Sequence, residues 1–455
     1  MSSRDGRTFT FMVEPAGAPA PRPGDVVAIR APGMATFLGQ VLQSEEDGPT
    51  TRGSGRLIGV YDTDGEVDLR GRRPFPEGSL VPGTADHLEA LQRAASADLP
   101  IGSWTSSGVS VAARLRAQGF GRHTFLCGQS GSGKTYALGV ILEQILLGTD
   151  LRMVVMDPNS DFVRLGETRP GAPEDAARRI ANSKITVLSA GAAGGRPLRL
   201  RFATMPRQAQ AAVLRLDPLA DREEYNIFLH RMAERSFADV VGLVHLLDRG
   251  GDEERALAQR IENLGFLDWE VWAGEQASAA EVVAEGSRLT VMDLSGFRDP
   301  HEPIAVALDL VERLWEQRAT RTPTLLVIDE AHNICPAEPV GPVQQAVVDR
   351  LIQIAAEGRK YGLWLLLSTQ RPSKIHPQVL SQCDNLALMR MNSPGDVAQL
   401  VEVFGFAPEA LLRLSPFFDQ GETLMAGAFV PVPSIMRMGD RLTYEGGSDV
   451  AVPRA

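Results

Sequence analysis

The chain has 455 residues, of which 44% are hydrophobic and 23% are charged, and its formal net charge is −11. This length predicts two or three domains of roughly 100–200 residues each, and no apolar run approaches the ~18 residues needed to span a bilayer. The acidic balance argues against a surface that coats itself with nucleic acid, although it leaves room for a local basic track such as the lining of a ring's channel.

The beginning of the chain and its metal-binding residue types exclude other classes. The first twenty residues lack the continuous apolar core of a signal peptide, so we expect a cytoplasmic location. Cys127, Cys335 and Cys383 are too few and too scattered for a disulfide framework or a zinc site, and we interpret them as small buried hydrophobes. The seven histidines show no metal-ligand spacing either.

The N-terminal part is rich in short β-type runs. Between residues 8 and 84 these runs are separated by Gly, Pro and Asp clusters, which predicts a small N-terminal β-barrel domain over residues 1–88. The proline-rich stretch "PAGAPAPRPG" fits a barrel loop better than a flexible linker. A short helix follows at "TADHLEAL", and we expect residues 89–121 to be a connecting segment.

From residue 122 to residue 455 the pattern changes to alternating strands and helices. Near-continuous apolar runs are typical of strands covered on both faces, so the pattern predicts an α/β domain with a parallel sheet. The wholly helical stretch at about 205–287 is interpreted as an insertion. The predicted strands are "HTFLCG", "RMVVMD", "KITVLS", "RLTVMDL", "TLLVIDE", "LWLLLSTQ", "NLALMRM" and "ETLMAG".

The strongest motif follows the first of these strands. The stretch "GQSGSGKTY" fits the phosphate-loop pattern G-x-x-x-x-G-K-[ST], with a strand before it and an amphipathic helix after it. Such a loop turns its backbone N–H groups toward phosphate oxygens at the positive end of a helix. The candidate nucleotide-binding residues are Gly128, Ser130, Gly131, Ser132, Gly133, Lys134, Thr135 and Tyr136.

Two residues of this loop have distinct predicted roles. Lys134 is expected to reach the β and γ phosphates of ATP, and the Thr135 hydroxyl to hold Mg²⁺. The alternative is a Gly/Ser-rich surface turn. A nucleophile elbow is excluded, because Ser132 stands where G-x-S-x-G requires a second glycine.

A pair of carboxylates ends another predicted strand in "LLVIDEAHNICP". Asp329 is the candidate Mg²⁺ ligand, and Glu330 is the candidate base that polarises the attacking water. This edge is where open α/β sheets bind ligands. The alternative is that both carboxylates only cap the strand and start a helix.

Two further candidates come from the stretch "EGRKYGLWLLLSTQRPS". Gln370 follows a strand, where a polar side chain can sense the γ phosphate or only bond a neighbouring loop. Arg359, beside Lys360, follows a helix, where it can reach the nucleotide of the next subunit or simply be a solvated basic helix end.

The turn "MDPNSDF" follows the strand after the phosphate-loop helix. Asp157 and Asp161 are therefore expected at the nucleotide edge of the sheet. Either carboxylate could order Mg²⁺ or water, but Asp-Pro-Asn-Ser is also a favourable turn sequence, and we weigh the two interpretations equally.

Taken together and in this order, these motifs resemble the HerA-type ATPases of the HerA/FtsK branch of ring-forming P-loop motors. The resemblance rests on "HTFLCGQSGSGKTYALGVILE", "VVMDPNSDF", "LTVMDLSG", "LLVIDEAHNICP", "EGRKYGLWLLLSTQRPS" and "VLSQCDNLALMRM", and covers nearly the whole chain. It implies a RecA-like P-loop core with an N-terminal barrel of the HerA/ATP-synthase type.

The resemblance also implies cofactors, partners and roles. It implies ATP and Mg²⁺, a homohexamer with ATP at the subunit interfaces, and a central channel for double-stranded DNA. It implies a nuclease partner, or in phage-defence systems a nuclease or NAD-hydrolase effector. Glu330, Gln370 and Arg359 then carry over as catalytic residues. One block departs from the family, because D-P-H-G-E-Y is replaced by "DPNSDF", which puts the role of Asp161 in doubt.

Three functions are compatible with these motifs. The first is an ATP-driven DNA translocase acting as the motor of a nuclease or defence complex. The second is an ATP-dependent ring scaffold that assembles or regulates an effector without processive movement. The third is a secretion or conjugation ATPase, which we rank lower because such proteins are often anchored in membranes.

The letters DEAH at residues 329–332 also label a helicase family with two tandem RecA-like domains. The chain ends too soon after Glu330 to hold a second such domain, since its remaining residues supply the later strands of the first sheet. We therefore interpret His332 as an incidental residue of the turn, more structural than catalytic.

Overall fold

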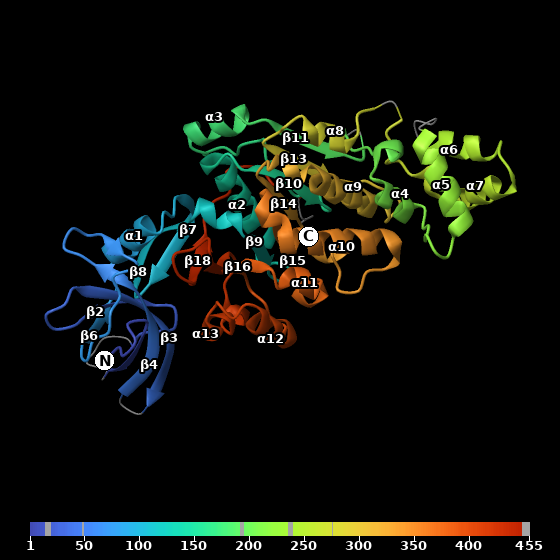
Figure 1. Ribbon diagram of the computed structural model, residues 1–455. Helices are drawn as coiled ribbons and strands as arrows, with labels where there is room; N and C mark the ends of the chain where they lie inside the picture. The colour runs from blue at the N-terminus through green and yellow to red at the C-terminus, as the bar shows by residue number, and fades with distance from the viewer. Residues whose placement is uncertain (14–19, 48–49, 192–194, 235–239, 275, 448–455) are drawn as a thin grey trace, which may run out of the picture. The chain divides into compact units, whose positions relative to one another are not determined.

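The computed structural model describes residues 1–13, 20–47, 50–191, 195–234, 240–274 and 276–447 (Figure 1). Part of the proline-rich stretch therefore lies outside the described residues. The chain divides into two compact units. The first unit holds Met1–Thr149, Gln370–Pro372 and Cys383–Arg441, and the second holds Asp150–Thr369, Ser373–Gln382 and the segment from Leu442 onward. Both units draw on distant parts of the chain.

The first unit begins with an antiparallel sheet, as the prediction of a small barrel requires. Its strands follow the order β1-β4-β3-β2-β6, with β5 paired to β4. Alternating Phe9 and Phe11 turn inward along β1, because successive side chains of a strand point to opposite faces. The strands are β1 (Thr8–Val13), β2 (Val26–Arg30), β3 (Thr36–Asp47), β4 (Thr50–Tyr61), β5 (Val67–Asp68) and β6 (Ser79–Pro82).

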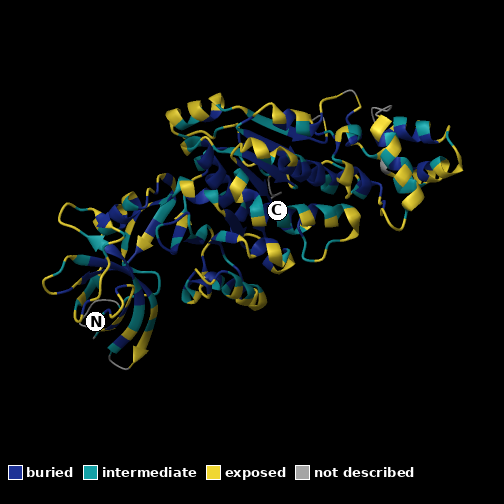
Figure 2. Ribbon diagram, in the orientation of Figure 1, coloured by how far each residue is buried: buried dark blue, intermediate teal, exposed yellow. Residues whose placement is uncertain are grey.

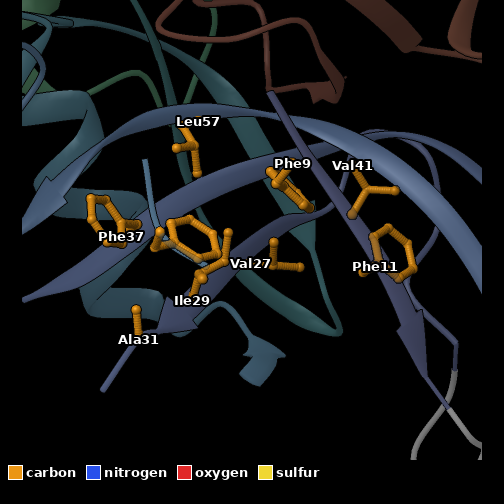
Figure 3. Packing of buried hydrophobic residues seen from close by; sticks show 9 residues of the cluster. Phe9, Phe11, Val27, Ile29, Ala31, Phe37, Val41 and Leu57 are labelled. Atoms are coloured by element: carbon orange, nitrogen blue, oxygen red, sulfur yellow. The ribbon is translucent and has the colours of Figure 1, made fainter. Parts of the chain in front are cut away.

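Aromatic and aliphatic side chains of these strands pack together as a buried cluster (Figure 3). Phe37 stacks on Phe75 with ring centroids 5.3 Å apart, a separation favourable for aromatic pairs. The buried cluster consists of Phe9, Phe11, Val27, Ile29, Ala31, Phe37, Val41, Leu57 and Phe75.

A second sheet of the first unit carries the phosphate loop. Its order is β9-β16-β17-β18-β7-β8, and only the pair β9 and β16 is parallel. The strands are β7 (Leu99–Ser106), β8 (Val109–Leu115), β9 (His123–Cys127), β16 (Cys383–Leu388), β17 (Glu422–Gly427) and β18 (Ser434–Met438). The helices are α1 (Ala85–Ala94), α2 (Lys134–Gly148), α12 (Pro394–Val403) and α13 (Glu409–Leu412).

This second sheet corrects two expectations. The predicted parallel pairing is present for β9 and β16, but β17 and β18 add antiparallel pairs, and the connection between these two strands is too short for the crossover that parallel strands need. The expected connecting segment 89–121 holds the β7–β8 hairpin, whose tight turn is formed by Ser107 and Gly108, both with positive φ.

The second unit contains a parallel sheet in the order β12-β11-β13-β10-β14-β15. Its central strands are buried, as expected for strands covered on both faces (Figure 2). The strands are β10 (Arg152–Asp157), β11 (Ile185–Ser189), β12 (Arg196–Pro197), β13 (Leu289–Asp293), β14 (Thr324–Ile328) and β15 (Leu363–Thr369). All eight strands predicted for the α/β part are therefore present.

The helices of the second unit include the predicted insertion. Its described residues form helices and no strand, and α5, α6 and α7 pack together (Figure 1). The helices are α3 (Glu174–Asn182), α4 (Arg207–Val213), α5 (Arg222–Glu234), α6 (Val240–Leu247), α7 (Asp252–Asn263), α8 (Ala279–Ala284), α9 (Glu302–Glu316), α10 (Gly341–Glu357) and α11 (Pro377–Leu380). Among the helices that can be described, none combines the length and the apolar character that crossing a bilayer requires.

Candidate functional site

The phosphate loop lies in the first unit between the buried strand β9 and helix α2. Gly131 has a φ of +75° and Gly133 a φ of +93°, with Gly133 at the N-cap position of α2. The backbone of residues other than glycine rarely adopts this conformation. The two glycines therefore allow the tight turn that leads into the helix. The loop thus ends at the positive end of a 15-residue helix, where backbone N–H groups bind phosphates.

Neighbouring segments of the same unit hold this loop from outside. The Gln129 N–H donates to the Arg390 carbonyl at 2.9 Å, and the Gly421 N–H donates to the Ser132 carbonyl at 3.1 Å. The Asn392 N–H also donates to the Gln129 side chain at 3.2 Å. These bonds fix the shape of the loop from neighbouring segments, and such restraint lowers the entropic cost of binding.

The three residues after the glycines begin helix α2. The Lys134 side chain is only 4% exposed, and Thr135 lies in the first helical turn. The Tyr136 hydroxyl accepts a hydrogen bond from the Arg441 N–H at 2.7 Å. Tyr136 therefore anchors the C-terminal segment, and a direct contact with nucleotide stays a prediction for this residue.

A buried ion pair ties the same helix to the C-terminal segment. Arg441 Nε lies 3.5 Å from Glu143 Oε1, and the two side chains are 0% and 1% exposed. The sequence carries a signal for this pair, since Glu143 is the only charged residue in the mostly apolar run "ALGVILEQILL". Buried charges of this kind require a partner.

We expect Glu143→Gln to lower the free energy of unfolding by about 3 kcal/mol, because the Arg441 charge stays buried without this carboxylate. The measurement is the midpoint of urea unfolding. Glu409→Gln is the matched control, since its pair with Arg413 is exposed and contributes less than about 1 kcal/mol. Equal shifts for both variants would contradict a stabilising role for the buried pair.

The two predicted carboxylates lie in the second unit, directly after β14. Asp329 is 1% exposed and Glu330 is 6% exposed. The Asp329 N–H donates to the Met156 carbonyl of β10 at 3.1 Å, which extends the pairing of the two strands by one bond. Both carboxylates are therefore held at the carboxyl edge of the parallel sheet, where open α/β sheets bind ligands.

Asp157 lies at the same edge, at the end of β10. Its carboxylate accepts backbone N–H groups from Asn159, Asp161 and Phe162 at 3.3, 3.0 and 2.7 Å. Burial raises the pKa of Asp157 to about 7, the nearby charges of Asp161 and Asp329 act in the same direction, and the N–H donors oppose both. The Asp157 carboxylate thus holds the turn at residues 159–162 in shape. It also lies near enough to Asp329 for the two charges to interact.

Gln370 and Arg359 lie at opposite ends of β15. Gln370 directly follows the strand, and Arg359 lies in the turn Gly358–Tyr361 that precedes it. A strand of seven residues spans about 20 Å. Arg359 is therefore far from the edge that carries Glu330 in the same unit, and its action on the nucleotide of another subunit stays a prediction.

One contact at this edge was not expected from the sequence. His332 Nδ1 lies 3.1 Å from Thr369 Oγ1 and 3.3 Å from Glu330 Oε2. His332, interpreted above as incidental, therefore touches the candidate base and the end of the neighbouring strand. No local sequence pattern reports this contact, because it depends on the pairing of β14 with β15.

The donor chemistry fits Mg²⁺. Thr135 in the first unit and Asp329 in the second unit each carry a hard oxygen donor, the kind that this ion prefers together with phosphate oxygens and water. Within the described part of the chain, no group of three or more His, Cys, Asp or Glu residues is arranged to hold a metal ion. An ion that also uses the phosphates of its nucleotide does not need such a cluster.

Comparisons with known proteins match both motif-bearing regions. Residues 99–314, which include the phosphate loop, match the family model described as "Helicase HerA, central domain". Residues 276–391, which include Asp329, Glu330 and Gln370, match the model "ATPase family associated with various cellular activities (AAA)".

Individual proteins similar to this chain also include proteins named as HerA helicases. "Probable DNA double-strand break repair helicase HerA" of Methanocaldococcus jannaschii is 32% identical over 145 residues, which cover 32% of this chain and 28% of that protein. "DNA double-strand break repair helicase HerA" of Pyrococcus furiosus is 22% identical over 372 residues, covering 70% of this chain and 65% of that protein. The alignments span 24–39% of the length of the first three curated relatives.

Among solved structures, VirB4 of Thermoanaerobacter pseudethanolicus superposes with a TM-score of 0.53 at 15% identity. The superposition covers 76% of this chain and 96% of that one. At this identity the likeness establishes the fold.

Proposed function

We propose that the chain is an ATP-hydrolysing DNA translocase of HerA type, because residues 99–314 match the family model "Helicase HerA, central domain". The match carries this proposal, and the conformation of the phosphate loop supports it. The VirB4 likeness is neutral between a DNA motor and a secretion ATPase, since it concerns the fold alone.

In the proposed reaction each predicted residue has one task. Lys134 binds the β and γ phosphates at the start of α2, and Glu330 accepts a proton from the water that attacks the γ phosphate. Gln370 contacts the γ phosphate and the attacking water. The burial of Lys134 and Glu330 strengthens both electrostatic contacts.

Mg²⁺ completes this proposed site. Thr135 and Asp329 would hold the ion, and when bound it neutralises charge on the phosphates. Thr135 lies in the first turn of α2 in the first unit, and Asp329 directly follows β14 in the second unit.

The proposed assembly is a homohexamer in which Arg359 acts on the nucleotide of the adjacent subunit. The distance between the two ends of β15 supports this, because Arg359 and Glu330 lie at opposite edges of one parallel sheet. An arginine supplied across an interface accelerates phosphoryl transfer by about 10³-fold or more.

We expect two inactive variants to complement each other. Subunits with Arg359→Ala keep an intact phosphate loop, and subunits with Lys134→Ala keep the arginine, so co-expressed mixed rings should regain ATPase activity at some interfaces. A mixture of Lys134→Ala with Glu330→Gln is the control, since both changes act within one subunit's own site. If the first mixture stays as inactive as the control, Arg359 does not act across an interface.

The proposed substrate is double-stranded DNA in the central channel, and the proposed partner is a nuclease or another effector of DNA repair or phage defence. The relatives named as DNA double-strand break repair helicases support the DNA substrate. The net charge of −11 implies that phosphate contacts are confined to a local surface such as a channel lining.

Movement along DNA is tested by displacement of a roadblock. A linear duplex with streptavidin bound to an internal biotin is incubated with protein, Mg²⁺ and ATP, and release of streptavidin is followed over time. Release that requires ATP and fails with Glu330→Gln is the expected result. Binding of DNA without any release would favour the second candidate, a ring scaffold whose ATP state assembles or restrains an effector.

A further inference from the structure

Three side chains meet at the carboxyl ends of two neighbouring strands of the second unit. Ile328 pairs with Leu367 in the parallel register of β14 and β15, so Glu330 and Thr369 each lie two residues beyond a paired position. His332 Nδ1 lies 3.3 Å from the Glu330 carboxylate and 3.1 Å from the Thr369 hydroxyl. One imidazole nitrogen thus contacts both strand ends.

The backbone explains how His332 reaches back to Glu330. Glu330 has a φ of +43° and a ψ of +47°, the left-handed conformation, which costs a residue other than glycine or asparagine of the order of 1–3 kcal/mol. The Asn333 N–H then donates to the Glu330 carbonyl at 2.9 Å and closes a single helical turn. Such strain persists only where surrounding contacts over-determine the conformation, and it is common at active sites.

Burial strengthens the contacts of His332 with Glu330 and Thr369. Thr369 is fully buried, and the side chains of His332 and Glu330 are 18% and 8% exposed. Electrostatic contacts and hydrogen bonds are both stronger in such a poorly solvated environment than in water. A glutamate side chain in water has several rotamers, and fixing it costs up to about 2 kcal/mol of entropy.

We propose that His332 is a positioning residue for Glu330, which it holds against the end of β15 in the orientation needed to accept a proton from the attacking water. The proposal rests on the proposed function, in which Glu330 is the base. The hydrogen bond of Nδ1 is made with the Thr369 hydroxyl, and it fixes the imidazole with the same nitrogen 3.3 Å from the Glu330 carboxylate. Thr369 directly precedes Gln370, so the contact also links the base to the strand that carries the candidate phosphate sensor.

The direct test compares His332→Leu with His332→Asn. Leucine fills similar volume but cannot donate, whereas the asparagine amide can donate from nearly the position of Nδ1. Misplacing a catalytic group by about 1 Å can cost up to 10²-fold in rate, so His332→Leu should lower kcat by about 10-fold to 100-fold. Its affinity for a non-hydrolysable ATP analogue and its urea-unfolding midpoint should stay unchanged, and His332→Asn should recover most of the loss.

A purely structural role for His332 gives a different result. In that case His332→Leu would lower the unfolding midpoint and analogue binding together with kcat, or leave kcat unchanged, and either outcome overturns the proposal. In a Glu330→Gln background the residual turnover should not fall further on changing His332, because a residue that acts through Glu330 has nothing left to position.

Failure of the proposed function is distinguishable from failure of this inference. If Glu330→Gln leaves turnover unchanged, the base lies elsewhere and the premise is wrong. If Glu330→Gln abolishes turnover while His332→Leu does not affect it, the premise stands and the positioning role is wrong. Thr369→Val, with Thr369→Ser as the control that keeps the hydroxyl, should show the same pattern with a smaller loss.

Discussion

Glu330→Gln is expected to lower the rate of ATP hydrolysis by about 10²-fold to 10⁴-fold, because glutamine cannot accept the proton of the attacking water. ATP binding should persist, since the amide has nearly the same shape and the phosphate loop is untouched. Removing a negative charge close to the phosphates should even tighten ATP binding slightly. The variant is therefore expected to trap ATP unhydrolysed.

The measurement combines steady-state phosphate release with equilibrium binding of ATP. Glu338→Gln is the matched control, because this glutamate lies in the same loop after β14 but is exposed. Hydrolysis by the control should equal that of the unaltered protein. Turnover by Glu330→Gln within a factor of two of the unaltered protein would place the base elsewhere.

Lys134→Ala is expected to weaken ATP binding by about 30-fold or more. Removing one partner of a buried, charge-assisted contact costs about 2–5 kcal/mol, and 1.4 kcal/mol corresponds to tenfold in affinity. Lys134 is 4% exposed at the start of α2, so little solvent screens its attraction for phosphate. Loss of hydrolysis follows from loss of binding.

Titration with a fluorescent ATP analogue measures this effect. Lys184→Ala is the control, because its ammonium group bonds the Glu285 carbonyl beside the amino end of β11 and lies away from the carboxyl edge. Binding of the analogue by Lys134→Ala at the affinity of the unaltered protein would refute the assignment of the phosphate loop.

Much of the α/β part could be predicted because its signals are local. Each buried parallel strand is a nearly continuous apolar run, and the phosphate loop is a contiguous motif between a strand and a helix. The β7–β8 hairpin also has a local signal, the alternation in "SWTSSGVSV" around Ser-Gly, although only a connecting segment is predicted there.

The unpredicted features depend on contacts between distant residues. Arg441 meets Glu143 only because the C-terminal segment returns to α2. In the second unit, Tyr444 N–H bonds the Glu167 carbonyl, and the Tyr444 ring lies under the Arg164 guanidinium. The contact of His332 with Thr369 likewise depends on strand register. No periodicity or motif encodes such pairings. The charged residue Glu143 in a mostly apolar helix does indicate that a buried partner exists, but it does not identify that partner.

The left-handed backbone conformation of Glu330, at the same edge of the sheet, also could not be predicted from the sequence. The sequence places two carboxylates after a strand, but it does not show that the second one adopts a left-handed conformation. Local preference and tertiary structure disagree at this residue, and such disagreements are expected at functional sites.

ATP hydrolysis measured with three DNA conditions tests the central claim most directly. The protein is assayed with no DNA, with closed circular duplex and with the same duplex cut to expose ends, and Glu330→Gln reports any contaminating activity. A DNA translocase that loads at ends should hydrolyse ATP fastest with the cut duplex, and its rate should rise with the concentration of ends. Equal turnover in all three conditions would contradict a DNA motor and leave an ATP-dependent scaffold.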